Sequence, residues 1–266
     1  MIIWGLYCPT RRATIAWIVG GILLACAILV RPAGIALPII VGILAAFVNP
    51  ATGIPYQRKW PLPVGTTMLL LTLLVLFPWG WRNERVLGGW IWTSTNAGIT
   101  AYDGFNPDAS GASDQRFIDR MPQLRSMSEI QRDRYLADQA GMFVRRNPRR
   151  ALDLAGIKIA RTWSPAPLSE KFSRPLYIAI GLCFALPIDL LMLIGLFGKK
   201  LPGRVKLFLL APALYLTLCA ALSVGSLRYR IPAEVPLAIL AAAGIVVIAE
   251  KAKPRTVLTP DAEPEI

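Results

Sequence analysis

PLYIAIGLCFALPIDLLMLIGLF, the sequence of Pro175–Phe197, contains a single charged residue, Asp189. An α-helix rises about 1.5 Å per residue, so about 20 apolar residues cross the hydrocarbon core of a bilayer. The composition extends this reading to the whole chain, because 55% of the 266 residues are hydrophobic, 17% are charged and the mean hydropathy is +0.50. Soluble domains carry about 25% charged residues. The sequence therefore predicts an all-α integral membrane protein.

Apolar runs of similar length recur along the chain and predict six transmembrane helices. They lie at residues 13–30, 33–48, 64–81, 175–197, 205–224 and 231–248. Pro32 divides the first two runs, because proline breaks the helical hydrogen-bond ladder and the adjacent Arg31 needs water. The predicted organisation is a three-helix membrane segment at 1–81, a large helical extracytoplasmic loop at 82–174, a second three-helix segment at 175–250 and a cytoplasmic tail at 251–266.

The short loops between these spans differ in their lysine and arginine content. One side of the membrane would carry Arg11, Arg12, Arg58, Lys59, Lys199, Lys200, Arg204, Lys206, Lys251, Lys253 and Arg255. The other side would carry Arg31, Arg228 and Arg230. Because cytoplasmic loops are enriched in lysine and arginine, this asymmetry predicts that both termini are cytoplasmic and that the loop at 82–174 lies outside.

Several function classes are disfavoured by residue content. The sequence contains no histidine, which removes histidine general bases and histidine metal ligands. The four cysteines lie in or beside apolar runs without a CxxC spacing, so they indicate packing and not a disulfide framework or a metal site. The net charge is +13, but no basic run is interleaved with aromatic residues, and nucleic acid is not an expected partner. We expect no cofactor and no metal.

The loop opens with TSTNAGITAYDGFNPDASGASD at residues 93–114, which is rich in Gly, Asn and Asp. The residues that follow Asp103 do not have the spacing of an EF-hand calcium loop. Two interpretations stay open. One is a structured turn without a ligand, since these residue types are common in turns. The other is a polar lid that binds sugar hydroxyls, with Phe105 as a stacking face. Its candidate substrate-loop residues are Asn96, Tyr102, Asp103, Asn106 and Asp108.

Two amphipathic helices are expected later in the loop. A capping box at Ser126-Met-Ser-Glu129 predicts a helix over 127–146, and Asn147-Pro148 predicts a second helix over 148–162. The expected apolar stripe of the second helix is Leu152, Ala155, Ile159 and Trp163. Its polar residues, expected to face away, are Arg149, Arg150, Asp153, Lys158 and Arg161. This helix could lie on a membrane surface or pack against the ends of the spans.

Ionisable residues near or within the C-terminal spans provide two further candidates. Arg228 and Arg230 are candidate lipid-phosphate-binding residues, because two arginines at headgroup level can form bidentate contacts with a phosphate. The alternative is an ion pair of Arg230 with Glu234 combined with interface anchoring. Asp189 falls within a predicted span, where an ionisable group is a functional candidate by default. We favour a helix–helix hydrogen bond for it over a proton pathway.

Four motifs, in order, resemble bacterial membrane glycosyltransferases of family 39 and the RgtA/B/C/D-like group, which are related to dolichyl-phosphate-mannose–protein mannosyltransferases. They are VRPAGIALPIIVG at 30–42, STNAGITAYDGFNPDASG at 94–111, FVRRNPRRALDLAGIKIARTWSP at 143–165 and RYRIPAEVPLAILAAAGI at 228–245. The resemblance implies a partial GT-C architecture in the bacterial cytoplasmic (inner) membrane. It also implies transfer of a sugar from a polyprenyl-phosphate carrier to a lipid, glycan or protein acceptor on the extracytoplasmic side.

In that family the catalytic acid lies in a first outer loop near the start of the protein, and this sequence offers no counterpart of that region. We therefore expect a C-terminal half that works with an N-terminal half or a partner chain, and no catalytic residue is assigned. The expected partners are membrane lipid and a polyprenyl-phosphate-linked sugar. One alternative is a catalytically silent membrane protein that binds lipid-linked glycans or scaffolds another transferase. A transporter component is a weaker alternative, because the spans lack paired polar residues at their centres.

Overall fold

A computed structural model describes residues 10–47, 64–168, 172 and 174–252. Every regular element in this part of the chain is a helix. Among the described residues, three helices are long and apolar enough to cross a membrane. They are α9 (Pro175–Phe197), α10 (Gly203–Leu222) and α11 (Ile231–Ala252). These helices support the membrane class that the sequence predicted.

Three further helices precede the loop. They are α2 (Thr10–Val30), α3 (Leu37–Phe47) and α4 (Val64–Leu87). A short 3-10 helix, η1 (Pro32–Gly34), separates α2 from α3 at the predicted proline, while α4 continues six residues past the predicted end of the third span. The count of six spans stays a prediction.

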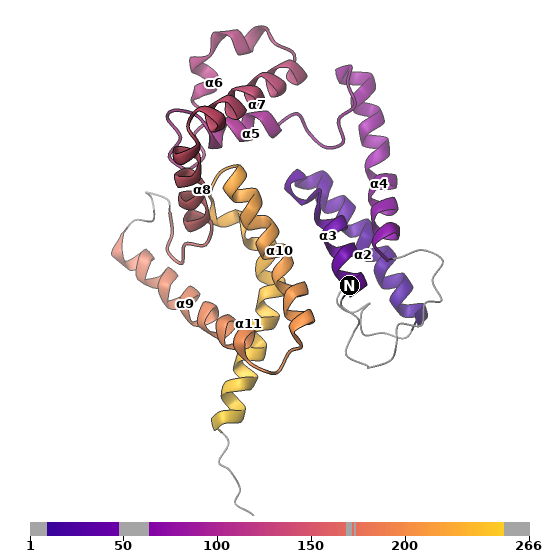
Figure 1. Ribbon diagram of the computed structural model, residues 1–266, viewed down its shortest axis with the longest axis vertical. Coiled ribbons are helices and arrows are strands. Elements are labelled where there is room, and N and C mark those ends of the chain that lie inside the picture. Colours follow the sequence, from indigo (N-terminus) through magenta and orange to yellow (C-terminus); the bar gives the residue numbers. More distant parts are fainter. Residues whose placement is uncertain (1–9, 48–63, 169–171, 173, 253–266) are drawn as a thin grey trace, which may run out of the picture.

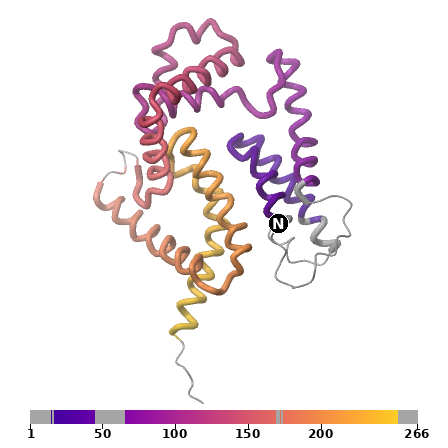
Figure 2. The backbone as a smooth tube through the Cα atoms, in the orientation of Figure 1, coloured from indigo at the N-terminus to yellow at the C-terminus, as the bar shows by residue number. Residues whose placement is uncertain are grey.

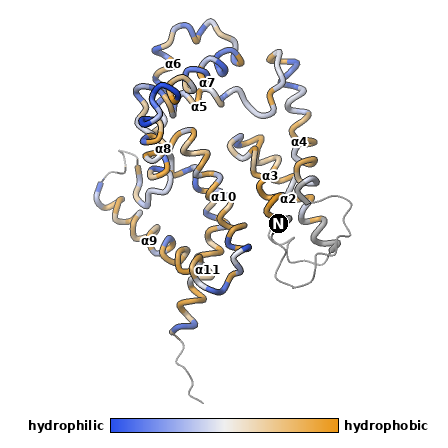
Figure 3. Tube along the Cα trace, in the orientation of Figure 1, coloured by the Kyte–Doolittle hydropathy of each residue, from blue (hydrophilic) through white to orange (hydrophobic). Residues whose placement is uncertain are grey.

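The helices form two groups that are joined across one end by the loop (Figure 1). In one group α2 and α3 pack against α4, and in the other α11 packs against both α9 and α10. Helix α3 contacts α10 and so links the groups. The backbone trace shows the loop helices arching from the end of α4 to the end of α10 (Figure 2). Coloured by hydropathy, the spanning helices are mainly hydrophobic and the arch contains most of the hydrophilic segments (Figure 3).

The crossing of α9 and α11 determines the shape of the second group. A Cβ atom built on Gly195 would overlap the carbonyl oxygen of Leu240, and one built on Gly244 would overlap that of Leu191. The two backbones therefore touch through glycine in the C-terminal half of α9. The N-terminal half of α9 diverges from α11 (Figure 1). Asp189 lies between the diverging half of α9 and the contact at Gly195. It lines a cavity together with Glu234 and Leu237 from the first two turns of α11.

The loop contains α5 (Ala97–Gly104), α6 (Phe117–Arg120), η2 (Pro122–Ser126), α7 (Glu129–Arg146) and α8 (Pro148–Thr162). Two apolar clusters hold these elements together. One consists of Phe105, Ala109, Ala140, Ala151 and Leu154, and the other of Ile99, Phe117, Leu124 and Leu136. The loop therefore has an apolar core of its own.

The predicted capping box of α7 was displaced by two residues. Ser128 is the N-cap: its hydroxyl accepts from the Gln131 backbone N–H at 3.3 Å, and the Gln131 side chain accepts from the Ser128 N–H at 3.0 Å. The Ser126 hydroxyl instead donates to the Gln123 carbonyl, because Ser126 ends the preceding η2 turn. The helix consequently begins at Glu129 and not at residue 127.

The bounds of α8 agree with the prediction, but its buried face does not. The buried residues are Ala151, Leu154, Lys158 and Thr162, whereas Leu152 of the predicted stripe is 73% exposed. The reason is the surface against which α8 packs. The Ala221 carbonyl at the end of α10 and the ring of Phe105 both interact with the Lys158 ammonium, so this lysine lies on the inward face of the helix. The expectation that Lys158 faces away from the protein was wrong.

Candidate functional site

Three arginines from distant parts of the sequence meet around η4 (Leu227–Tyr229), the turn between α10 and α11. The Arg31 guanidinium lies 4.6 Å from the centroid of the Tyr229 ring and donates to the Arg228 carbonyl at 3.2 Å. The Arg228 guanidinium lies 5.5 Å from the same centroid. We call Arg31, Arg228 and Arg230 the arginine cluster. Arg31 is not among the site residues predicted from the sequence, although the charge asymmetry assigns it to the same side as the other two.

The side chain of Arg230 is largely shielded from solvent, with 18% of it accessible. Its Nε donates to Glu234 Oε1 at 2.7 Å, and its Nη1 donates to the Ser164 carbonyl at 3.1 Å. The ion pair that the sequence offered as an alternative is thus formed. Within the described residues Nη2 forms no hydrogen bond, so one edge of the fixed guanidinium is available to a ligand.

Two adjacent cavities share Arg230 as part of their walls. The loop cavity, of about 310 Å³, is lined by Ser164, Pro165, Ala166, Pro167, Phe172, Tyr177, Ile180, Gly181, Phe184, Ala185, Leu227 and Arg230. The wedge cavity, of about 260 Å³, lies between α9 and α11 and is lined by Trp163, Phe184, Ala185, Ile188, Asp189, Met192, Arg230, Glu234, Leu237 and Ala238. Both cavities have mainly apolar walls. Arg230 is the ionisable residue that lines both, and Asp189 and Glu234 line the wedge cavity alone.

Asp189 is the second carboxylate of the wedge cavity, beside Glu234. It lines the wedge cavity and interacts electrostatically with Arg230 and Glu234. It forms no hydrogen bond or ion pair with any residue that the structure describes, so the helix–helix hydrogen bond that we favoured is not formed within that part of the chain. The divergence of α9 from α11 explains the difference, because it leaves a space where a hydrogen-bonding partner would otherwise pack.

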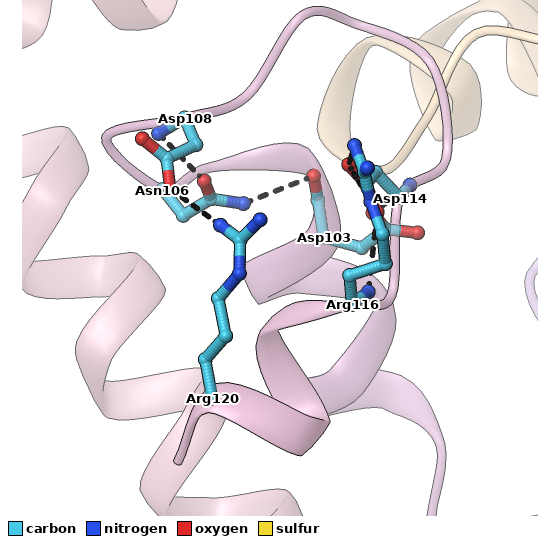
Figure 4. A network of polar contacts seen from close by, with 6 residues as sticks. All are labelled: Asp103, Asn106, Asp108, Asp114, Arg116 and Arg120. Atoms are coloured by element: carbon cyan, nitrogen blue, oxygen red, sulfur yellow. Dashed lines mark hydrogen bonds and ion pairs between the residues drawn. The ribbon is translucent and has the colours of Figure 1, made fainter.

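The polar residues of the loop lie in two different environments (Figure 4). Asp103 is 3% exposed, and its two carboxylate oxygens accept from the Asp114 N–H at 2.7 Å and the Ser113 hydroxyl at 2.6 Å. Asn106 is also buried; its side chain donates to the Tyr102 carbonyl at 2.7 Å and accepts from the Asp108 N–H at 2.8 Å. Both side chains therefore hold the turn together.

The other candidate loop residues lie nearer the surface. Asn96 is exposed before the first residue of α5, and Asp108 is exposed and pairs with Arg120 at 3.5 Å. Tyr102 is half-buried against Phe117, and burial, with smaller effects from Tyr135 and Asp108, raises its pKa. Asp114 pairs with Arg116, whose hydrogen bonds lower the pKa of the Asp114 carboxyl to about 2. These side chains do not converge on one point.

The loop nevertheless reaches the turn that carries the arginine cluster. The Gly225 N–H donates to the Gly111 carbonyl at 2.8 Å, and Gly111 has a φ of +85°, a conformation that favours glycine. A Cβ atom at Gly104 would overlap the Ser223 carbonyl oxygen, so the end of α5 also lies directly on the segment after α10. The opening stretch of the loop is therefore docked beside η4.

Lys158 of α8 also lies at this junction. Its Nζ is fully buried, lies 3.3 Å from the centroid of the Phe105 ring and donates to the Ala221 carbonyl at 3.3 Å. Loss of hydration lowers its pKa to about 8, and the negative charge of Asp103 partly opposes this shift. Sequence reasoning missed this residue because a lysine in an amphipathic helix is normally assigned to solvent. Its spacing of four residues from Leu154 was the available signal.

Comparison with known proteins found no relative. No family model matches the chain, and neither a curated protein nor a solved structure matches it. Among the residues that the structure describes, no group of three or more His, Cys, Asp or Glu side chains is placed to hold a metal ion.

Proposed function

We propose that this chain is part of a membrane glycosyltransferase that takes a sugar from a polyprenyl-phosphate carrier and transfers it to a lipid, glycan or protein acceptor on the extracytoplasmic side. The observation that carries the proposal is the position of Arg230. It is a largely buried arginine with a free Nη2 edge, and it lies in the wall between two mainly apolar cavities.

This arrangement suits an amphiphile whose polar head is a phosphate. A guanidinium presents its N–H donors in a rigid fork that matches phosphate oxygens, and the pairing strengthens where water is scarce. Arg228 and Arg31 add positive charge at the neighbouring Tyr229 ring. The aromatic and aliphatic walls of the loop cavity, such as Phe172, Ile180 and Phe184, offer apolar contact to a prenyl chain.

The transfer would break the bond between the anomeric carbon and the phosphate oxygen, with the electron pair leaving on that oxygen. Guanidinium groups fixed beside the phosphate stabilise the charge that develops there. A general base must accept the proton of the attacking hydroxyl. We assign that role to no residue of this chain and expect an N-terminal half or a partner chain to supply it.

The alternative function, binding of lipid-linked glycans without catalysis, is favoured by one observation. Asp103 and Asn106, the two buried polar residues of the opening loop, form their hydrogen bonds with other residues of the same loop. A transfer assay with labelled carrier separates the two functions, because only the enzyme moves the label to an acceptor.

The phosphate role is tested with the full chain reconstituted in lipid nanodiscs and polyprenyl phosphate as the probe. Replacing both Arg228 and Arg230 by alanine should weaken binding at least about tenfold, because charge-assisted hydrogen bonds contribute about 1.5–3 kcal/mol each. The matched control is Lys199→Ala with Arg204→Ala, two exposed basic residues at the connection between α9 and α10. Equal affinity in the two double variants would contradict the proposal.

A further inference from the structure

The charges in the wedge cavity do not balance. Glu234 is paired with Arg230 at 2.7 Å, whereas Asp189 has no hydrogen-bonding partner among the described residues. The cavity therefore contains one guanidinium and two carboxylates. A ligand that brought only a phosphate would satisfy Arg230 but would leave Asp189 unpaired beside it.

The surroundings of Asp189 make that unpaired state costly. Phe184, Ile188 and Met192 line the same cavity, and a carboxylate against apolar walls loses hydration unless hydrogen-bond donors replace it. Trp163, on another side of the cavity, already donates its ring N–H to Thr217 at 2.8 Å, so it does not supply that donor. No described residue of the cavity donates a hydrogen bond to Asp189, so its carboxylate is open to a donor from a bound molecule.

We propose that Asp189 recognises the sugar of the bound carrier, accepting hydrogen bonds from its hydroxyl groups while Arg230 binds the adjoining phosphate. This inference rests on the proposed function and adds a recognition residue to it. The two side chains line one cavity, and a glycosyl phosphate is a group that carries an anion and several hydroxyl donors side by side. Asp189 would accordingly distinguish a carrier that bears a sugar from one that has lost it.

The test compares two probes on the full chain in nanodiscs: polyprenyl phosphate, and a set of its hexosyl esters with glucose, galactose and mannose. Native mass spectrometry measures each affinity. The wild-type chain should bind at least one hexosyl ester about tenfold or more tightly than free polyprenyl phosphate. Asp189→Leu should reduce this ratio to about one and should not weaken the binding of free polyprenyl phosphate, because the lost carboxylate is a like charge beside that phosphate.

Leucine suits the test because it keeps an apolar helix intact in a membrane. Cys183→Leu, at an exposed position of the same helix, controls for the added leucine and should keep the wild-type ratio. The inference is overturned if the wild type shows no preference for any hexosyl ester, or if Asp189→Leu keeps the preference. Failure of the Arg228 and Arg230 double variant to weaken binding of free polyprenyl phosphate would instead refute the proposed function, so the two failures are distinguishable.

Discussion

Lys158 brings a positive charge into the junction between the loop and α10, and its titration should affect stability. The folded pKa is about 8 and the ordinary value is 10.5. Below pH 8 the ammonium is charged in both states, and the folded protein bears the full cost of its desolvation. Between about pH 8 and 10.5 the unfolded chain binds more protons at this residue than the folded one. The contribution of Lys158 to the free energy of unfolding therefore rises with pH over this range.

Replacing Lys158 by methionine removes the charge and keeps most of the volume of the side chain. We expect this variant to be more stable than wild type at pH 7 by about 2 kcal/mol, since the relieved desolvation exceeds the loss of one hydrogen bond and the contact with Phe105. The difference should shrink as the pH is raised from 7 to 10, followed by denaturant unfolding in detergent. Lys251→Met, at an exposed position, should show no such trend. A variant that is less stable than wild type by the same amount at every pH would refute this account.

Single residues also show where sequence reasoning reached its limit. The types of residue at the site, arginine near the last span and an acid within α9, were evident from the sequence. Their partners were not, because Arg31 and Arg228 are 197 positions apart and no local pattern specifies that contact. Likewise, the inward turn of Lys158 depends on the Ala221 carbonyl and the Phe105 ring, which only the folded arrangement brings to α8.

At the scale of elements, the crossing of α9 and α11 sets the spacing of the two helices that form the walls of the wedge cavity. Gly195 and Gly244 allow the two backbones to touch, so a methyl group at Gly195 would force the helices apart. We expect Gly195→Ala to lower the free energy of unfolding by about 1–3 kcal/mol, as overpacking in well-packed interiors does. The same change should also weaken binding of polyprenyl phosphate, because the cavity walls belong to the two displaced helices.

Gly156 supplies the matched control for this prediction. It lies within α8, and a Cβ atom there would meet nothing within 4 Å. Gly156→Ala should therefore be neutral or should stabilise the protein by up to about 1 kcal/mol through its better helix propensity. Chemical unfolding of both variants in the same detergent provides the comparison. If Gly195→Ala were as stable as Gly156→Ala, the close crossing would not be essential.

Helix bounds were predictable where a local signal was unambiguous and failed where two signals competed. The Asn147-Pro148 pair and the Arg174-Pro175 pair mark the starts of α8 and α9, and both helices begin as predicted. The start of α7 had two overlapping capping boxes, one from Ser126 and one from Ser128. Ser126 is the last residue of η2, so Ser128 and not Ser126 is the N-cap of α7. The sequence contained no strong sign of this short turn.

At the scale of the whole molecule, the class of membrane protein was predictable because it depends on composition and on the length of apolar runs. The arch of loop helices over the two groups was not predictable, since it depends on contacts such as that between Gly225 and Gly111, which connect distant parts of the chain (Figure 1). The side of the membrane on which this arch lies is still a prediction, and the proposed function depends on it.

That orientation can be measured with reporter fusions in a bacterial inner membrane. Alkaline phosphatase fused after Pro122, within the arch, should be active, because the enzyme folds only outside the cytoplasm and the positive-inside rule assigns the arch to that side. The same reporter fused after Pro202, in the basic connection between α9 and α10, should be inactive, and a fluorescent protein should give the opposite pattern at both positions. Activity only after Pro202 would place the arginine cluster on the cytoplasmic side. In that case a lipid phosphate could still bind at Arg230, but transfer to an extracytoplasmic acceptor would be excluded, because the site would open to the wrong compartment.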